Sequence, residues 1–138
     1  MRLRVVTLPV LLILIGVLAS ARRADAVREP RYANIVAACT GAPNDTARVE
    51  PPSIAMKRAD HVQWRSRSPN ADSFAVTPKN PDDWPFAELS FKGTRSAPAV
   101  TPEPLPTAIL GHAYRYDVTV FCRNGTTQTI DPDIIIGE

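Results

Sequence analysis

A chain of 138 residues with 44% hydrophobic and 22% charged side chains is long enough for one small globular domain. Sixteen Lys and Arg against 14 Asp and Glu give a net charge of +2, too small an excess for a polybasic nucleic-acid-binding protein. The 14 prolines exclude a mainly helical fold, because each interior proline destabilises a helix by about 3 kcal/mol.

The first 26 residues have the pattern of a secretory signal. Arg2 and Arg4 precede an apolar run over residues 5–18, and small-residue cleavage patterns end at Ala21 and Ala26. The apolar run is shorter than the roughly 20 residues that span a bilayer. We therefore expect cleavage, after Ala26 in preference to Ala21, and not a retained membrane anchor.

Removing residues 1–26 changes the charge balance of the chain. Residues 27–138 hold twelve Lys and Arg against thirteen Asp and Glu, so the positive excess belongs to the leader. We expect a single mature domain, secreted or periplasmic, that binds no nucleic acid and does not insert stably into membranes.

Two cysteines, Cys39 and Cys122, remain in the expected mature domain. An even number of cysteines in an exported protein favours a disulfide, which here would close a loop of more than 80 residues. Two separate buried thiols are the alternative.

Short alternations of apolar and polar residues, separated by turn residues, indicate an all-β domain. We expect strands at residues 32–39, 51–56, 61–65, 73–77, 87–93, 114–123, 126–130 and 134–136. The second and third of these are expected to form a hairpin around a polar turn at residues 57–60. Residues 94–107 contain four prolines and are expected to cross the fold as an irregular, extended segment.

The strand at residues 114–123 has the clearest alternation. Its inward face would carry Tyr114, Tyr116 and the apolar residues that follow at every second position. These tyrosines could form a stacking platform, but a place in the core is the favoured interpretation. Asn124-Gly125 is the strongest short signal for a hairpin, so residues 126–130 should return along this strand.

Three stretches of the chain resemble the cupredoxin family of plastocyanin and azurin. Residues 52–64 are similar to its proline, apolar alternation, turn and Val-x-Trp, with Ala59-Asp60 where Gly-Asp is usual. Residues 111–116 resemble its Gly-x-Tyr-x-Phe/Tyr strand, and residues 131–136 resemble a closing strand. The resemblance implies a Greek-key β-sandwich of about seven strands.

The copper ligands of that family are missing from the matching positions. A blue-copper site uses two histidines, a cysteine thiolate and usually a methionine. The first histidine would fall near residues 73–76, which contain none, and the cysteine at about Val118. No histidine or methionine follows Cys122. We therefore expect no copper site of this type, no other metal site and no cofactor.

The remaining soft donors form no recognised metal-binding spacing. They are Met56, His61, His112 and the two cysteines. Two solvent-facing histidines are the favoured interpretation. The alternative is a copper-binding or redox carrier with a rearranged site that uses His112 and Cys122, which would compete with the disulfide for the same sulfur.

No catalytic pattern stands out in the sequence. A Gly-x-Ser-x-Gly motif is absent, and Asp131 and Asp133 flank Pro132 as expected for a turn before a strand. We expect a non-enzymatic protein.

One loop combines acidic and aromatic side chains, Asp82, Asp83, Trp84 and Phe86. It could be a recognition surface, because loops on rigid sandwiches often bind ligands. It could also fold its aromatic rings back over the core, which we favour. The sequence predicts a binding or structural module for an unidentified protein or small molecule, acting through this loop or the segment 94–107.

Overall fold

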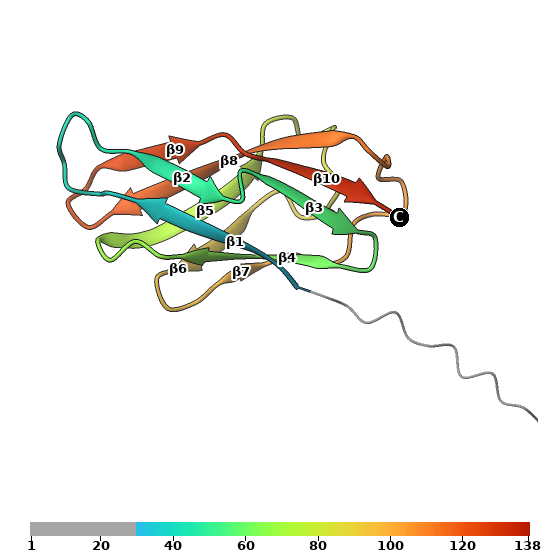
Figure 1. Cartoon of the computed structure of the whole chain (residues 1–138), viewed down its shortest axis with the longest axis horizontal. Coiled ribbons are helices and arrows are strands. Elements are labelled where there is room, and N and C mark those ends of the chain that lie inside the picture. The colour runs from blue at the N-terminus through green and yellow to red at the C-terminus, as the bar shows by residue number, and fades with distance from the viewer. Residues whose placement is uncertain (1–29) are drawn as a thin grey trace, which may run out of the picture.

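The computed structural model describes residues 30–138, and the expected leader, residues 1–26, lies outside them. The described chain forms ten strands and no helix (Figure 1). The strands are β1 (Pro30–Ala37), β2 (Ala47–Glu50), β3 (Ser53–Lys57), β4 (His61–Ser66), β5 (Ala71–Pro78), β6 (Phe91–Thr94), β7 (Ala99–Val100), β8 (Ala113–Cys122), β9 (Thr127–Ile130) and β10 (Asp133–Gly137).

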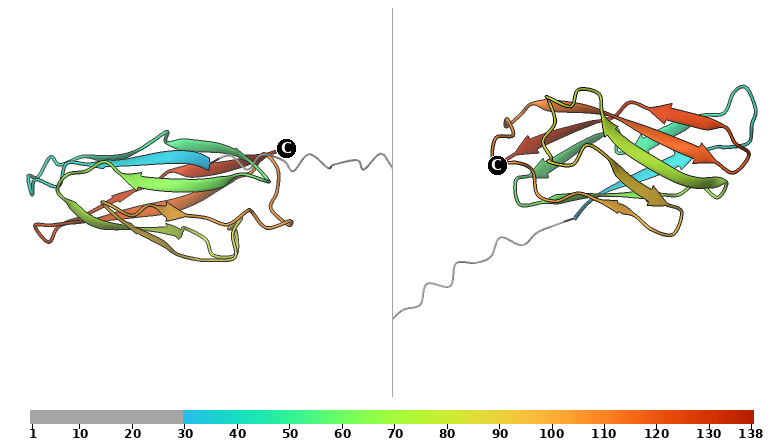
Figure 2. Two further views of the ribbon diagram at one scale, coloured as in Figure 1. Left: turned by 90° about the horizontal axis from the view of Figure 1, so that it is seen from below. Right: turned by 180° about the vertical axis from the view of Figure 1, so that it is seen from behind.

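The strands form two sheets that lie one above the other, as the edge-on view in Figure 2 shows. One sheet has the order β2-β1-β4-β7, and the other has the order β3-β10-β8-β5-β6, with β9 also paired to β8. This sandwich-like architecture confirms the all-β prediction. The strands number ten where about seven were expected, partly because β2 and β7 have only four and two residues, too short to show alternation.

The core lies between the sheets and is built from the alternating apolar positions. Val62 and Trp64 on β4 and Tyr116, Val118 and Val120 on β8 are fully buried. Ile54 and Met56 on β3, Phe74 and Val76 on β5, and Ile134 and Ile136 on β10 are also buried. The inward faces predicted from the alternation are confirmed for β3, β4, β5 and β8.

The hairpin expected between β3 and β4 is wrong. The strand β3 pairs in parallel with β10, whereas β4 pairs in parallel with β1 of the other sheet. Residues 57–60 therefore cross from one sheet to the other. Alternation identifies the buried side of a strand, but it does not identify the strand that forms its hydrogen bonds.

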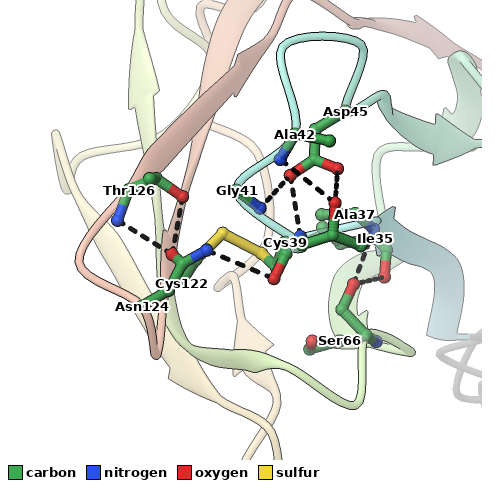
Figure 3. Close-up of a disulfide and its surroundings, with 12 residues drawn as sticks. Ile35, Ala37, Cys39, Gly41, Ala42, Asp45, Ser66, Cys122, Asn124 and Thr126 are labelled. Carbon is green, nitrogen blue, oxygen red and sulfur yellow. Dashed lines mark hydrogen bonds between the residues drawn. A yellow bond between two sulfur atoms is a disulfide. The ribbon is translucent and has the colours of Figure 1, made fainter.

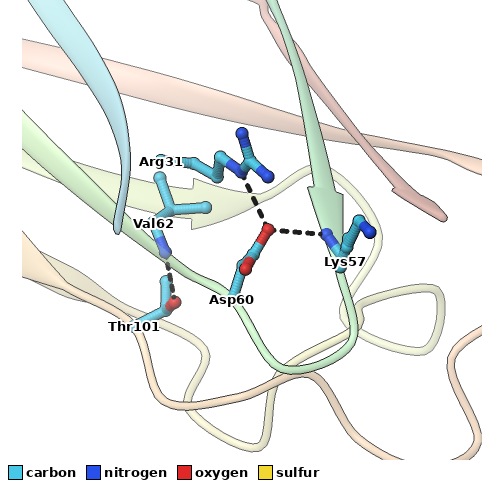
Figure 4. Close-up of polar contacts among 5 residues, drawn as sticks. All are labelled: Arg31, Lys57, Asp60, Val62 and Thr101. Atoms are coloured by element: carbon cyan, nitrogen blue, oxygen red, sulfur yellow. Dashed lines mark hydrogen bonds and ion pairs between the residues drawn. The ribbon is translucent and has the colours of Figure 1, made fainter. Parts of the chain in front are cut away.

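Asp60 anchors this crossing from a buried position. Only 3% of the residue is exposed. Its Oδ2 accepts hydrogen bonds from Arg31 Nε at 2.8 Å and from the Lys57 backbone N at 3.0 Å (Figure 4). The residue that the sequence placed in a polar turn is thus a buried structural acceptor that connects β1 to the end of β3.

The hairpin predicted at Asn124-Gly125 is confirmed. The strands β8 and β9 pair antiparallel, and Gly125 adopts a φ of 84°, which glycine reaches without the steric cost of a side chain. The Asn124 carboxamide oxygen accepts a hydrogen bond from the Thr126 backbone N at 3.0 Å. The last strand, β10, pairs with the beginning of β8.

The strand expected over residues 87–93 is shorter than predicted. It begins only at Phe91, and Ala87 and Leu89 are exposed. In the preceding segment Trp84 Nε1 donates a hydrogen bond to the Glu88 carbonyl at 3.0 Å, and pairing with β5 begins only at Phe91, opposite Val76. Beyond Thr94, which ends β6, residues 94–107 contain only the two-residue strand β7, as expected for an irregular crossing.

Candidate functional site

The two cysteines form a disulfide that joins the two sheets. Cys39 follows β1, Cys122 ends β8, and their Cα atoms are 5.4 Å apart (Figure 3). The disulfide predicted from the sequence is confirmed. It fixes the end of the sandwich at which β1 and the β8–β9 hairpin meet.

The loop after Cys39 is held by one carboxylate. Asp45 accepts hydrogen bonds from the backbone N atoms of Thr40 at 2.7 Å and Gly41 at 2.8 Å, and also from the Thr40 hydroxyl. The Thr40 hydroxyl is the main cause that lowers the pKa of Asp45. Desolvation, the next largest effect, opposes it, and the two backbone donors lower the pKa further. The carboxylate thus stays ionised and shapes the loop beside the disulfide.

The donors of the alternative copper site are not brought together. His112 immediately precedes β8 and Cys122 ends it, so the ten-residue strand separates them by about 30 Å at ~3.3 Å per residue. His112 Nε2 lies 2.9 Å from Asp83 Oδ2, and the Cys122 sulfur is used in the disulfide. No group of three or more His, Cys, Asp or Glu side chains within residues 30–138 could hold a metal ion.

The loop at residues 82–86 turns its aromatic rings inward. Trp84 is 7% exposed and Phe86 is 2% exposed, and their ring centroids lie 5.3 Å apart. Trp84 also packs against Tyr116 at 6.0 Å, which makes it part of the core. Of the predicted binding loop, Asp82 is exposed and Asp83 is half-buried against His112.

The tyrosines of β8 also belong to the core. Tyr114 is 3% exposed and Tyr116 is fully buried. The Tyr116 hydroxyl accepts a hydrogen bond from Trp64 Nε1 at 3.2 Å. Burial raises the pKa of Tyr116, although the bond from Trp64 opposes this effect. Neither ring is available as a stacking platform.

A surface hollow with a mainly apolar lining lies elsewhere, along β5 and β6. It has a volume of about 520 Å³. Its lining residues are Ser73, Phe74 and Ala75 on β5, Lys92, Gly93 and Thr94 on β6, Ala97 in the β6–β7 turn and Phe121 on β8.

Strand register explains the shape of this hollow. On β5, Ser73 lies between Phe121 of β8 and Thr94 of β6 in one row of the sheet. In the next row, Ala75 lies opposite Lys92. The small side chains of β5 are therefore flanked by longer ones on the neighbouring strands, which leaves a trough along β5.

Gly93 forms part of the apolar lining by having no side chain. A Cβ atom at this position would lie 2.3 Å from Phe74 Cζ, which shows that the Phe74 ring lies directly against the β6 backbone. Any larger residue at position 93 would have to displace this ring or shift β6.

A second hollow, of about 560 Å³, adjoins the first and shares Ser73 and Thr94 with it. It is lined by Asp72, Ser73, Thr94, Arg95, Ser96 and Arg123. We call these two hollows together the β6 groove. The β6–β7 turn that forms its rim links the two sheets at the edge where β6 and β7 are labelled in Figure 1.

The β6 groove carries an excess of positive charge that no other described residue compensates. Lys92, Arg95 and Arg123 are exposed, and none of them forms an ion pair with another residue in the range 30–138. Asp72 is the one acidic residue in its lining. The groove thus has an excess of two positive charges in a domain whose charges are almost balanced.

A third hollow, of about 280 Å³, lies next to the same turn and adds Arg65 and Arg67 from the β4 side. These two arginines are held by neighbours. The Arg65 guanidinium lies 3.9 Å from the centroid of the Tyr32 ring, and Arg67 Nε donates to the Asn34 carboxamide at 3.1 Å. Positive side chains from both sheets therefore gather around the β6–β7 turn.

The β6 groove could not be predicted from the sequence because its residues come from three separate segments. Only residues 94–97 fall in a region that the sequence had singled out as a possible binding segment. Phe121 was visible as the one apolar residue on the outward face of its strand, which is the signal that could have indicated the groove.

Comparisons with known proteins give no family for this chain. No protein-family model matches the sequence, and no curated protein shows significant similarity to it. No helix in residues 30–138 is long and apolar enough to cross a membrane.

Proposed function

We propose that this protein is an exported, non-enzymatic binding module whose β6 groove takes an anionic ligand. In this proposal the domain is a cupredoxin-like Greek-key sandwich that lacks a type 1 copper site. The leader pattern and the disulfide support export, because disulfides persist mainly in oxidising compartments. The two-layered all-β fold supports a rigid scaffold for a surface site.

The observation that carries the proposal is the set of uncompensated cations around a concave surface. Arg95 and Arg123 line the same hollow, and each guanidinium can form two parallel hydrogen bonds to a carboxylate, sulfate or phosphate. The hydroxyls of Ser73, Thr94 and Ser96 add neutral donors to the same lining. An anion bound here would gain charge-assisted bonds without breaking an existing ion pair.

The groove lining supports binding more than catalysis. It contains hydroxyl groups but no histidine, the most common general base, and no cysteine nucleophile. His112 lies near the opposite end of β8 from Arg123 and pairs with Asp83.

The proposal is tested by titrating the mature domain with anionic probes at low salt while backbone amide NMR signals are recorded. The probes are inorganic phosphate, citrate and 1-decanesulfonate, with decylammonium as a cationic control. We expect saturable shifts at residues 72–75, 92–97 and 121–123 with at least one anion and none with the cation. Replacing both groove arginines (R95Q and R123Q) should weaken binding at least tenfold and reduce its salt dependence.

The matched control replaces two arginines that already have acidic partners outside the groove, Arg48 with Glu50 and Arg115 with Asp131. The R48Q and R115Q pair changes the net charge by the same amount and should leave binding within twofold. Equal losses in both double variants would show a general charge effect, and an absence of saturable shifts with every anion would refute the proposed function.

A further inference from the structure

The geometry points to an amphiphilic organic anion as the ligand, a molecule with an apolar chain or ring and one carboxylate, sulfonate, sulfate or phosphate group. This inference rests on the proposed function, and it concerns which chemistry the β6 groove selects. It follows from the way in which the apolar and the cationic parts of the groove are arranged.

The apolar part is built on a face that is otherwise polar. Phe121 points outward from β8 and is 41% exposed. Its row neighbours across the sheet are Thr127 on β9 and Ser73 on β5. The neighbouring row contains Thr119, Ala75 and Lys92. A phenyl ring exposed among hydroxyl-bearing side chains, beside a hollow, presents an apolar wall to a ligand.

The rest of the lining of this part is also mainly apolar. Ala75, Ala97 and the backbone of Gly93 line it, with the buried Phe74 directly beneath Gly93. Lys92 contributes an aliphatic stem to the same hollow while its ammonium group can stay in water. The volume of about 520 Å³ falls in the range typical of sites for small organic molecules.

The cationic part lies at one end of the apolar part. Arg123 lies in the turn directly after β8, two residues beyond Phe121, and lines the second hollow together with Ser73. Arg95 directly follows β6, whose last residue, Thr94, is paired with Ser73. The two guanidinium groups thus approach the same end of the trough from its two sides.

This arrangement fits a ligand that lies along β5. Its anionic group would contact Arg95 and Arg123, and its apolar part would lie between Phe121 and the stem of Lys92. An inorganic anion would leave the apolar part unused, and a neutral lipid would leave the two arginines unused. The amphiphile is the ligand class that contacts both parts at once.

The test compares three probes on the mature domain by isothermal titration calorimetry, each below its micelle concentration. 1-Decanesulfonate carries an anionic head and an apolar tail. Ethanesulfonate carries the same anionic head with almost no tail, and decyl maltoside carries the same length of tail on an uncharged head. We expect decanesulfonate to bind at least tenfold more tightly than ethanesulfonate and at least tenfold more tightly than decyl maltoside. This comparison needs no variant and does not depend on the folding of a mutant.

Substitution of Phe121 then locates the effect in the groove. The F121S variant should bring decanesulfonate within about threefold of ethanesulfonate while leaving the binding of ethanesulfonate unchanged. The matched control is L89S, since Leu89 is 51% exposed but lies outside the groove. This control should retain the full tenfold ratio.

The outcomes separate this inference from the proposed function. If decanesulfonate and ethanesulfonate bound with equal affinity, and both lost affinity when Arg95 was changed to Gln, the groove would still be an anion site. The inference of an amphiphilic ligand would then be wrong. A sulfated oligosaccharide that binds more tightly than decanesulfonate, and loses affinity when Arg65 and Arg67 are changed to Gln, would show a polyanion site and also overturn it. If decyl maltoside bound as tightly as decanesulfonate, or if none of the three probes bound, both the inference and the proposed function would be refuted.

Discussion

At the scale of single residues, Trp64 and Tyr116 show what alternation reveals and what it leaves out. Their positions at every second residue of a strand predicted that both side chains face inward. The structure adds that they contact each other, with ring centroids 5.7 Å apart and a hydrogen bond from Trp64 Nε1 to the Tyr116 hydroxyl. Two large amphipathic residues can be buried because each satisfies the polar group of the other.

Replacing Tyr116 with Phe should lower the free energy of unfolding by about 1–3 kcal/mol, because the buried Trp64 N–H loses its acceptor. Burial raises the pKa of Tyr116 above the ordinary tyrosine value of 10.0. Its contribution to stability is therefore complete below pH 10 and falls as the pH rises further. Urea unfolding at pH 7 measures the first effect, and a flatter stability curve of Y116F above pH 10 measures the second.

The control for this variant is Tyr32→Phe. Tyr32 is 45% exposed and stacks with Arg65 through its ring, which Phe retains. This change should alter the free energy of unfolding by less than about 0.5 kcal/mol. A Y116F protein as stable as the Y32F protein would contradict the importance of the buried hydrogen bond.

At the scale of elements, the segment 57–60 differs most from the sequence prediction. A polar tetrapeptide between two alternating strands is typical of a hairpin, yet here it connects the two sheets. The buried Asp60 carboxylate, which holds Arg31 and the Lys57 backbone N, is what distinguishes this crossing from a surface turn. A carboxylate gives no signal of its burial in the sequence, because its partners come from β1 and the end of β3.

Changing Asp60 to Ala should lower the free energy of unfolding by about 2–4 kcal/mol, because a buried charge-assisted hydrogen bond and a backbone acceptor are both lost. Asp72→Ala is the matched control. Because Asp72 is exposed, this change should alter the free energy of unfolding by no more than about 0.5 kcal/mol. Chemical denaturation of both variants checks the difference. Equal stability would mean that the crossing does not depend on the Asp60 carboxylate.

At the scale of the whole molecule, net charge and charge distribution give different information. The nearly balanced composition of residues 27–138 led to the expectation that no strong field steers this domain. The fold nevertheless gathers Arg65, Arg67, Lys92, Arg95 and Arg123 around the hollows beside the β6–β7 turn. Five cations with one nearby carboxylate, Asp72, produce a local field that the composition hides.

The disulfide also acts on the whole molecule, because it ties the end of β1 in one sheet to the end of β8 in the other. It spans 83 residues of sequence, so it strongly restricts the unfolded chain. The C39S/C122S double variant should lose about 2–5 kcal/mol of free energy of unfolding relative to the oxidised protein. Thermal unfolding of the variant against the oxidised wild type, with and without reductant, measures this loss.

The reduced wild-type protein serves as the control for the double variant. It should unfold at nearly the same temperature as C39S/C122S, since both lack the cross-link. A reduced protein as stable as the oxidised one would show that the cross-link contributes nothing beyond the packing of the two sheets.

The sequence by itself determined the all-β class, the buried side of most strands, the cysteine pair and the Asn124-Gly125 hairpin. Each of these depends on short-range patterns, or on an even number of cysteines in a chain with a leader pattern. The strand partners, the burial of Asp60 and the β6 groove were decided only by the tertiary structure. They depend on which residues lie opposite each other across the sheets, and these residues are far apart in the chain.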